Sequence, residues 1–339
     1  MRESGLAIER GAAALDALLE RDEAMPIPTH TPRQTRASGR VPASPIVASD
    51  LHVFIAEPIP AREPILAPII LEQSLTMIHA WRGAGKTHVA LGIAYAVASG
   101  GKFLRWHADR PRKVIYLDGE MPGAALQERL AAIIKTNDKE PPPGYFRLVT
   151  PDKQAGAMPD LATGEGQVSV DSIIEANTAL VIVDNLSCLV RRGGRENEAE
   201  SWLTVAEWAL KHRAQGRSIL FIHHSGKNGQ QRGTSKREDL LDTVVLLRQG
   251  RDYDPADGAV FEVHFEKARG LFGKDTDPFE AKLTTNSDGE QRWTMRAVED
   301  STVERVLELK ALGMTQTEIA GELGVNKSTV CRALARAGK

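Results

Sequence analysis

The chain has 339 residues, of which 42% are hydrophobic and 26% charged, values ordinary for a soluble globular protein of two or slightly more domains. Its 43 basic and 45 acidic residues exclude a global positive field, so any nucleic-acid contact must come from local patches. Two cysteines, Cys188 and Cys331, cannot form a disulfide framework or a four-ligand zinc site. We find no membrane-spanning stretch or secretory signal, and we expect a cytoplasmic enzyme or binding protein.

The first 50 residues differ in pattern from the rest of the chain. Residues 6–23 have apolar side chains at helical spacing and predict an amphipathic helix, either docked on a partner or loosely packed. Residues 24–50 contain five prolines with few side chains able to pack, which predicts a flexible linker. We therefore expect residues 1–50 to form a helix and a linker.

From residue 51 onward, short β-rich runs alternate with helical patterns, which predicts an α/β fold with a mainly parallel sheet. Strands are predicted at 75–80, 113–118, 145–149, 179–184, 218–223 and 242–247, and helices at 89–99, 123–135 and 198–215. The runs 259–268, 279–285 and 292–298 lack intervening helices and predict an antiparallel extension. We expect one domain over residues 51–299 and a small all-α domain over 300–339.

A phosphate-binding loop is predicted where a strand ending at Ala80 meets the segment WRGAGKT at residues 81–87. The segment matches G-x-x-x-x-G-K-[ST] except that Ala80 replaces the first glycine, and its remaining glycines still let backbone N–H groups surround phosphate. Lys86 is expected to bind the β- and γ-phosphates of ATP and Thr87 to ligate Mg²⁺. A glycine-rich turn without a ligand is the alternative. The residues expected to line the nucleotide are Trp81, Arg82, Gly83, Ala84, Gly85, Lys86, Thr87 and His88.

Two acidic residues follow predicted buried strands. Asp184 ends the apolar run ALVIVD, where its carboxylate can reach the Mg²⁺ shell. Glu120 follows the run KVIYLD, where a carboxylate beside the γ-phosphate can orient and partly deprotonate the attacking water. The alternatives are a turn-forming Asp184 and a solvated Glu120 at the start of a helix.

Two further pairs follow or end strands. His223 and His224 are expected to include a sensor of the γ-phosphate, with a metal pair or a structural role as alternatives. Lys267 and Arg269 lie on one side of a strand and are expected to reach a neighbouring subunit's γ-phosphate, although exposed cations are often only solvated.

A loop at residues 226–242 is rich in glycine, glutamine and basic residues. It is expected to contact a DNA backbone, and an ordinary surface loop is the alternative. The cations expected to make this contact are Lys227, Arg232, Lys236 and Arg237.

Taken in order, the segments WRGAGKT, VIYLDGEMP, ALVIVDN, ILFIHHSGK, QRGTS and FEKAR resemble the RecA-like AAA-family ATPases of the RepA-type hexameric plasmid replication helicases, with DnaB as a more distant relative. The resemblance covers residues 75–270. It implies a ring of six subunits with ATP and Mg²⁺ at each interface, and translocation on single-stranded DNA. It also implies that Glu120 is the catalytic carboxylate and that Lys267 and Arg269 act in trans. The N-terminal arm and the C-terminal module depart from the family's small members.

The C-terminal module has the spacing of a helix-turn-helix and resembles the DNA-binding domains of recombinases and sigma-like regulators. Residues 301–313 predict one helix, with Val303, Val306, Leu307 and Leu309 near one face. Thr315 with Glu318 predicts a capping box for the second helix, Gly324 a tight turn, and Asn326 the cap of the third. Six basic and four acidic residues lie in 301–339, and a protein-docking bundle is the alternative to DNA binding. The expected DNA-binding residues of the last helix are Lys327, Ser328, Thr329, Arg332 and Arg336.

These features together predict an oligomeric DNA-dependent ATPase, with a hexameric replicative helicase of a plasmid, phage or mobile element as the first hypothesis. Its expected partners are single-stranded and duplex DNA, further copies of the chain, and a primase or initiator, but no membrane. The second hypothesis is an ATP-dependent DNA-binding regulator or helicase loader, and the third a recombination filament. The sequence does not separate a closed ring from an open filament.

Overall fold

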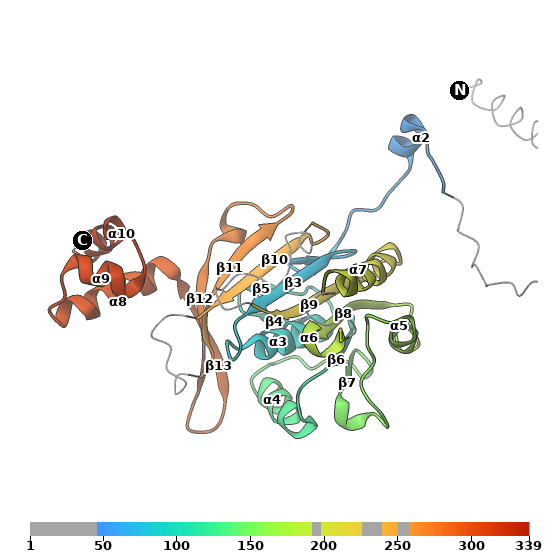
Figure 1. The fold of residues 1–339 in the computed structure, drawn as a ribbon, viewed down its shortest axis with the longest axis horizontal. Coiled ribbons are helices and arrows are strands. Elements are labelled where there is room, and N and C mark those ends of the chain that lie inside the picture. The colour runs from blue at the N-terminus through green and yellow to red at the C-terminus, as the bar shows by residue number, and fades with distance from the viewer. Residues whose placement is uncertain (1–45, 192–197, 226–238, 250–257, 339) are drawn as a thin grey trace, which may run out of the picture. The chain divides into compact units, whose positions relative to one another are not determined.

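The structure, a computed structural model, describes residues 46–191, 198–225, 239–249 and 258–338 (Figure 1). Contacts divide the chain into two units, residues 1–59 and 60–339. In the described part of the first unit, helix α2 (Leu51–Ala56) begins after Asp50, whose carboxylate accepts a hydrogen bond from the N–H of His52. The predicted helix over residues 6–23, and the predicted linker as far as residue 45, lie outside the described residues.

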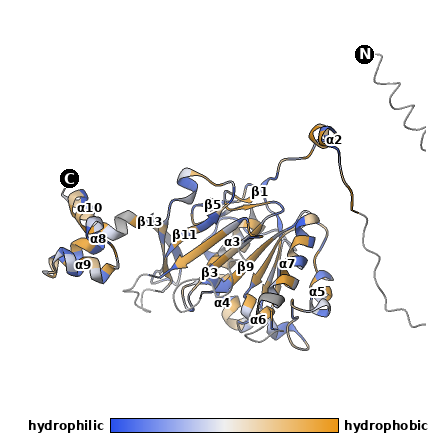
Figure 2. Ribbon diagram, turned by 45° about the horizontal axis from the view of Figure 1, so that its top comes forward, coloured by the Kyte–Doolittle hydropathy of each residue, from blue (hydrophilic) through white to orange (hydrophobic). Residues whose placement is uncertain are grey.

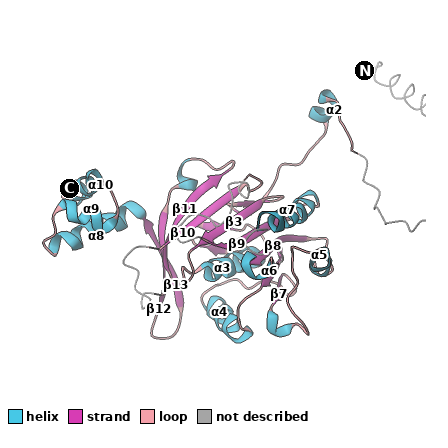
Figure 3. Cartoon of the chain, in the orientation of Figure 1, coloured by secondary structure: helices cyan, strands magenta, loops and turns pink. Residues whose placement is uncertain are grey.

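A nine-stranded sheet in the order β13-β12-β11-β10-β3-β9-β8-β6-β7 forms the centre of the second unit (Figure 3). Its parallel strands are β3 (Leu75–Ala80), β6 (Lys113–Asp118), β7 (Phe146–Val149), β8 (Thr178–Asp184), β9 (Ser218–His224) and β10 (Thr243–Arg248). The antiparallel strands are β11 (Val260–Ala268), β12 (Phe279–Thr285) and β13 (Gln291–Ala297). The predicted α/β class, with a mainly parallel sheet and an antiparallel extension, is confirmed.

Both faces of the parallel part of the sheet are buried, which is why its strands are continuous apolar runs (Figure 2). Successive residues of β8 show this directly. Leu180 and Ile182 belong to one buried apolar cluster, whereas Val181 and Val183 belong to a second cluster. Because strand side chains alternate between faces, the two clusters cover opposite sides of the sheet.

Helices connect the parallel strands, as the alternating pattern predicts. They are α3 (Lys86–Ser99), α4 (Gly123–Lys135), α5 (Gly164–Asp171), α6 (Leu186–Leu189) and α7 (Glu198–Ala214). The 3₁₀ helices η1 (Pro151–Lys153) and η4 (Gly273–Thr276) are short. Helix α4 has the predicted bounds, and α3 begins three residues before the predicted start at 89 because the phosphate loop runs straight into it.

The shortest elements of the fold were not predicted. Helix α5 has eight residues, two of them glycine, and α6 has only four. The other missed elements are α2, the two 3₁₀ helices and two small sheets, formed by β1 (Pro64–Leu66) with β2 (Ile70–Leu71) and by β4 (Lys102–Phe103) with β5 (Trp106–His107). Strands of two or three residues carry no readable periodicity, so tertiary contacts decide them.

The C-terminal residues form three helices, α8 (Val298–Ala311), α9 (Gln316–Leu323) and α10 (Lys327–Ala337). Val306, Ile319 and Val330 are fully buried at their centre. The predicted capping box is present, since Thr315 accepts a hydrogen bond from the N–H of Glu318 and the Glu318 side chain accepts from Thr315. Gly324 ends α9 in the left-handed region at φ 62°, as the predicted tight turn requires.

Two details of this bundle differ from expectation. Leu307, predicted near the inner face of the first helix, is 43% exposed because the buried stripe follows Val303, Val306 and Leu309 instead. Asn326 occupies the N-cap position of α10, but its side chain makes no capping hydrogen bond. No helix within the described ranges is long and apolar enough to cross a membrane.

Candidate functional site

The predicted phosphate loop lies between the last residue of β3 and the first turn of α3. Gly83 and Gly85 have φ values of 81° and 88°, in the left-handed region that favours glycine. A Cβ on Gly85 would also lie 3.1 Å from the Cβ of Ala259. Ala80, at the place of the first glycine, is the last residue of β3 and pairs with His224 of β9, so the departure from the motif falls in the strand and leaves the turn unchanged.

The Lys86 side chain is buried against the loop. Its ammonium Nζ donates hydrogen bonds to the carbonyl oxygens of Ala80 at 3.1 Å and Trp81 at 2.9 Å. Burial lowers the Lys86 pKa to about 8, although the carboxylates of Asp184 and Glu120 act in the opposite direction. An anionic group bound in front of the loop would stabilise the protonated amine of Lys86 and raise its pKa.

A cavity of about 590 Å³ opens beside the loop, a size typical of small-ligand sites. It collects side chains from the loop, α3, the ends of β6, β8 and β9, the start of α4, and the residues before β11. Its lining is formed by Gly83, Gly85, Lys86, Thr87, His88, Asp118, Glu120, Met121, Pro122, Ala125, Arg129, Asp184, Asn185, His224, Gly258 and Ala259.

Asp184 lies at the carboxyl end of β8 and is almost completely buried. The Tyr116 hydroxyl donates a hydrogen bond to its Oδ2 at 2.5 Å, and the Thr87 side chain is also hydrogen-bonded to this carboxylate. The Asp184 pKa is raised to about 6, mainly by burial and also by the charge of Asp118, while the hydrogen bonds from Tyr116 and Thr87 act in the opposite direction. The oxygens of Thr87 and Asp184 are hard ligands of the kind that Mg²⁺ prefers, so this pair fits that ion.

The raised pKa predicts that the buried Asp184 carboxylate destabilises the folded protein at neutral and alkaline pH. The pKa is about 6 in the folded chain against 3.8 ordinarily, so between these values the folded state binds more protons and the free energy of unfolding falls as pH rises. At about 1.4 kcal/mol per pKa unit, Asp184→Asn should stabilise the protein by about 1–3 kcal/mol at pH 8, and by less at pH 5.

Melting temperatures of the two proteins at both pH values measure this effect. Asp109→Asn is the matched control, since the Asp109 side chain is 75% exposed and its neutralisation should change little. An Asp184→Asn protein that melts at or below the wild-type temperature at pH 8 would contradict the assigned cost of the buried charge.

Glu120 lies at the edge of the same cavity, next to the ends of β6 and β8. The turn that carries it is fixed by Asp118, which accepts hydrogen bonds from the N–H groups of Glu120 and Met121 at 3.2 Å. The Glu120 carboxylate accepts a hydrogen bond from Asn185 Nδ2 at 2.5 Å and remains 59% exposed. It therefore combines a fixed position with access to water.

The two predicted histidines occupy different places. His224 lines the cavity, with its Nε2 3.9 Å from Oε2 of Glu120. His223 is buried in β9 beside His79 of β3 and does not line the cavity. Because successive strand residues point to opposite faces, only one of the pair can face the cavity.

Lys267 and Arg269 do not meet the phosphate loop of their own chain. Both side chains donate hydrogen bonds to the carbonyl oxygen of Asp239, at 3.3 Å and 2.9 Å. They lie at the end of β11, where Ala268 pairs with Thr243 at the start of β10. The loop follows the opposite ends of the parallel strands, so the two cations lie at the other edge of the sheet.

The predicted DNA-contacting residues fall into two groups. Lys227, Arg232, Lys236 and Arg237 lie outside the described residues. On α10, the side chains of Lys327, Ser328, Arg332 and Arg336 are exposed, whereas Thr329 is half-buried and accepts a hydrogen bond from Arg332 Nη2 at 3.3 Å.

Several residues around the cavity were not predicted as site residues, among them Asp118, Asn185 and Tyr116. Asp118 and Asn185 directly adjoin Gly119–Glu120 and Asp184, and that adjacency is the signal that could have identified them. Tyr116 lies inside an apolar strand, where no local pattern distinguishes a hydrogen-bond donor to Asp184 from an ordinary core residue. In the part of the chain that the structure describes, no cluster of three or more His, Cys, Asp or Glu side chains could hold a metal by itself.

A comparison with curated protein sequences finds no match. Among solved structures, the chain is similar to the RadB recombinase (16% identity, TM-score 0.44, covering 63% of this chain and 88% of that one). It is also similar to a KaiC-like protein from the hyperthermophilic archaeon Pyrococcus horikoshii OT3 (14% identity, TM-score 0.46, covering 68% of this chain and 93% of that one).

Two family profiles match the chain in the order that its sequence predicts. Residues 301–338 match the homeodomain-like domain, in agreement with the three C-terminal helices. Residues 42–230 match the AAA domain, and this span includes the phosphate loop, Glu120, Asp184 and His224. Since the match covers more than half of its residues, the chain belongs to the AAA domain family.

Proposed function

We propose that this protein is a DNA-dependent ATPase in which ATP hydrolysis drives movement on DNA, with a hexameric replicative helicase as the specific form. The observation that carries the proposal is the meeting of Lys86, Thr87, Glu120, Asp184 and His224 around one cavity of about 590 Å³. Phosphoryl transfer needs this set of groups, because its catalysis consists mainly of positioning and charge stabilisation.

Each side chain has a defined part in the proposed reaction. Lys86 leaves the carbonyl oxygens of Ala80 and Trp81 to bind the β- and γ-phosphates, and the N–H groups of the loop surround the phosphate oxygens. Thr87 and Asp184 hold Mg²⁺, which when bound neutralises phosphate charge.

Glu120 orients the attacking water and takes up its proton, while Asn185 holds the carboxylate in position through its 2.5 Å hydrogen bond. His224 contacts the γ-phosphate, and its Nε2 lies only 3.9 Å from Oε2 of Glu120. A shift of His224 on phosphate binding is transmitted to the loop that follows β9. Of the two histidines, we assign the sensor role to His224.

The positions of Lys267 and Arg269 support a role in trans. They lie at the edge of the sheet opposite to the phosphate loop of their own chain, so the γ-phosphate they meet belongs to a neighbouring copy. A site completed by the next subunit needs a head-to-tail assembly, which closes into a ring or continues as a filament. We propose the ring, with single-stranded DNA bound through the loop at residues 226–242 and a primase or initiator as a further partner.

The C-terminal bundle supports a second candidate function, an ATP-dependent DNA-binding regulator or helicase loader. Exposed Lys327, Arg332 and Arg336 on α10 suit phosphates and base edges in a major groove. In this alternative, duplex recognition by the bundle is the main activity, and ATP controls assembly.

Deletion of residues 301–339 tests how the two activities are divided. We expect loss of duplex DNA binding while hydrolysis stimulated by single strands is largely retained, because the nucleotide site draws no residue from the bundle. Gel-shift titration and ATP turnover measure the two activities at one stated salt concentration. Loss of both in a shortened protein that still melts cooperatively would exclude this modular division.

A further inference from the structure

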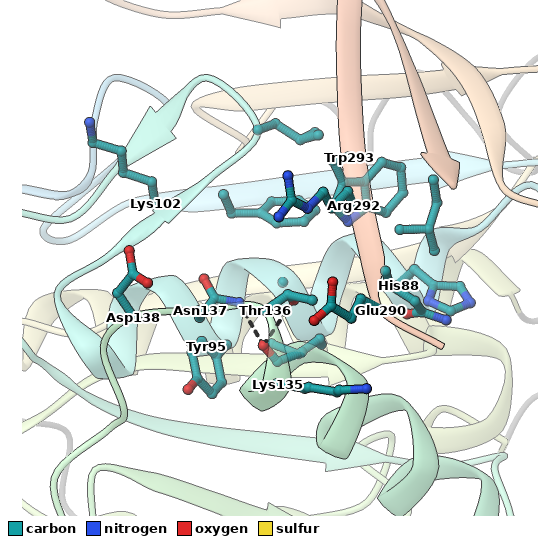
Figure 4. A pocket seen from close by; sticks show the side chains of 16 residues that line it. His88, Tyr95, Lys102, Lys135, Thr136, Asn137, Asp138, Glu290, Arg292 and Trp293 are labelled. Carbon is teal, nitrogen blue, oxygen red and sulfur yellow. Dashed lines mark hydrogen bonds between the residues drawn. The ribbon is translucent and has the colours of Figure 1, made fainter. Parts of the chain in front are cut away.

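A second cavity, of about 530 Å³, lies beside the first and shares only His88 with it. Its walls come from α3, the β4 turn, the end of α4 with the residues after it, and the β12–β13 hairpin (Figure 4). None of the residues to which the ATPase reaction is assigned lines it. Its volume lies in the range of sites that bind small organic ligands.

Aromatic rings form a fixed apolar surface in this cavity. Phe103 and Trp293 contact edge to face, with ring centroids 5.7 Å apart and planes at 85°. Gly92 of α3 lies directly against Phe103, since a Cβ at this position would come within 2.1 Å of the ring. Phe103 is only 7% exposed, so the half-buried Trp293 supplies the more accessible ring of the pair. Aromatic rings bind nucleobases by stacking and apolar contact.

Cations outnumber carboxylates among the charged side chains that line the cavity. Lys102 and Arg292 are exposed, and within the described ranges neither side chain has a hydrogen bond or an ion pair. Lys135 also lines the cavity, but its Nζ already donates to the carbonyl oxygen of Asp288 at 2.7 Å. Asp138 and Glu290 are the carboxylates of the lining, so three cations face two carboxylates.

Tyr95 adds a buried hydroxyl group to the lining. The Tyr95 side chain is 3% exposed, and its hydroxyl lacks a hydrogen-bond partner among the described residues, which is uncommon for a buried polar group. Burial, together with the charge of Glu140, raises the Tyr95 pKa, so the hydroxyl keeps its proton to donate.

We infer that this cavity is a second nucleotide-binding site, which takes a base against Phe103 and Trp293 and an attached phosphate at Lys102 and Arg292. The base and phosphate come from a free mononucleotide or from a DNA strand. The site is distinct from the phosphate loop, and its occupancy does not depend on the proposed ATPase function. Because His88 follows Thr87 and faces both cavities, a ligand here adjoins the first turn of α3.

Binding measured by calorimetry on the full-length Lys86→Ala protein tests the inference, because this background weakens phosphate binding at the first site. The probes are deoxyadenosine monophosphate, inorganic phosphate and a short oligodeoxythymidine. We expect the mononucleotide to bind more tightly than phosphate alone, and Arg292→Gln to weaken its binding at least about tenfold, as loss of a charge-assisted hydrogen bond implies.

Lys274→Gln is the matched control, since Lys274 is exposed on η4 and does not line the cavity, and it should leave binding unchanged. Tyr95→Phe is a second variant, which removes only the buried hydroxyl and should weaken binding without lowering the melting temperature. Oligonucleotide binding that depends on Arg292 would identify a DNA strand as the source, whereas Arg292-dependent binding of the mononucleotide alone would identify a free nucleotide.

Several results would overturn the inference. One is absence of mononucleotide and oligonucleotide binding in the Lys86→Ala protein, and another is affinity for both that Arg292→Gln leaves unchanged. Phosphate binding as tight as mononucleotide binding would remove the base from the proposed ligand. Failure of the wild-type protein to hydrolyse ATP would contradict the proposed function but leave this binding test intact.

Discussion

Arg269→Ala is expected to lower ATP turnover by about 10³–10⁵-fold while ATP binding is retained. The guanidinium lies at the sheet edge opposite to its own phosphate loop, so in the proposed assembly it acts on the site of a neighbouring copy. Among the described residues its Nη2 donates a hydrogen bond to a backbone carbonyl oxygen, that of Asp239, at 2.9 Å. Removing this bond should therefore cost little stability.

Mixing two defective proteins separates action in trans from action in cis. Arg269→Ala subunits keep an intact phosphate loop, and Lys86→Ala subunits keep an intact Arg269. Interfaces that combine the loop of the first with the arginine of the second should recover part of the turnover. Lys274→Ala, which removes an exposed cation elsewhere, should behave as wild type. Complete absence of recovery in the mixture would contradict the trans assignment.

Glu120→Gln is expected to lower turnover by about 10²–10⁴-fold, the range associated with loss of a general base. Glutamine keeps an oxygen that can accept the hydrogen bond from Asn185, and the side chain is 59% exposed, so the fold should be unaffected. ATP binding should remain at the wild-type level, because Glu120 acts on the attacking water. Turnover of radiolabelled ATP and binding of a fluorescent ATP analogue measure the two effects.

The control for this substitution is Glu128→Gln, which makes the same chemical change on an exposed residue of α4 outside the cavity. Its turnover should equal that of the wild type. If Glu120→Gln hydrolysed ATP within a few-fold of the wild-type rate, the catalytic base would have to be sought elsewhere, and Asp118 at the end of β6 is the nearest other carboxylate on that segment.

The sequence predicted the large elements well, because buried parallel strands and their crossover helices have strong periodic signals. β3, β6 and β12 have the predicted bounds. Residues of the candidate site were also predictable where they end or follow such strands, since the carboxyl ends of parallel strands meet at one edge of a sheet. By this rule Glu120, Asp184 and His224 are expected to lie close together, and all three line the cavity.

What the sequence did not predict depends on contacts between distant segments. His79 stands inside an apolar strand, yet its two ring nitrogens lie 2.9 Å from the Ser225 hydroxyl and 2.7 Å from the Glu266 carboxylate. It thus links the residue after His224 to the residue before Lys267. The second cavity has the same origin, because Gly92, Phe103 and Trp293 meet only through the folded sheet.

ATP turnover of the purified protein without DNA, with single-stranded DNA and with duplex DNA, at one low salt concentration, tests the central claim most directly. The proposed motor predicts strong stimulation by single strands, which Glu120→Gln abolishes. A hydrolysis rate that DNA does not change, or that rises only with a particular duplex, would contradict the proposed motor. It would favour the ATP-dependent regulator or helicase loader.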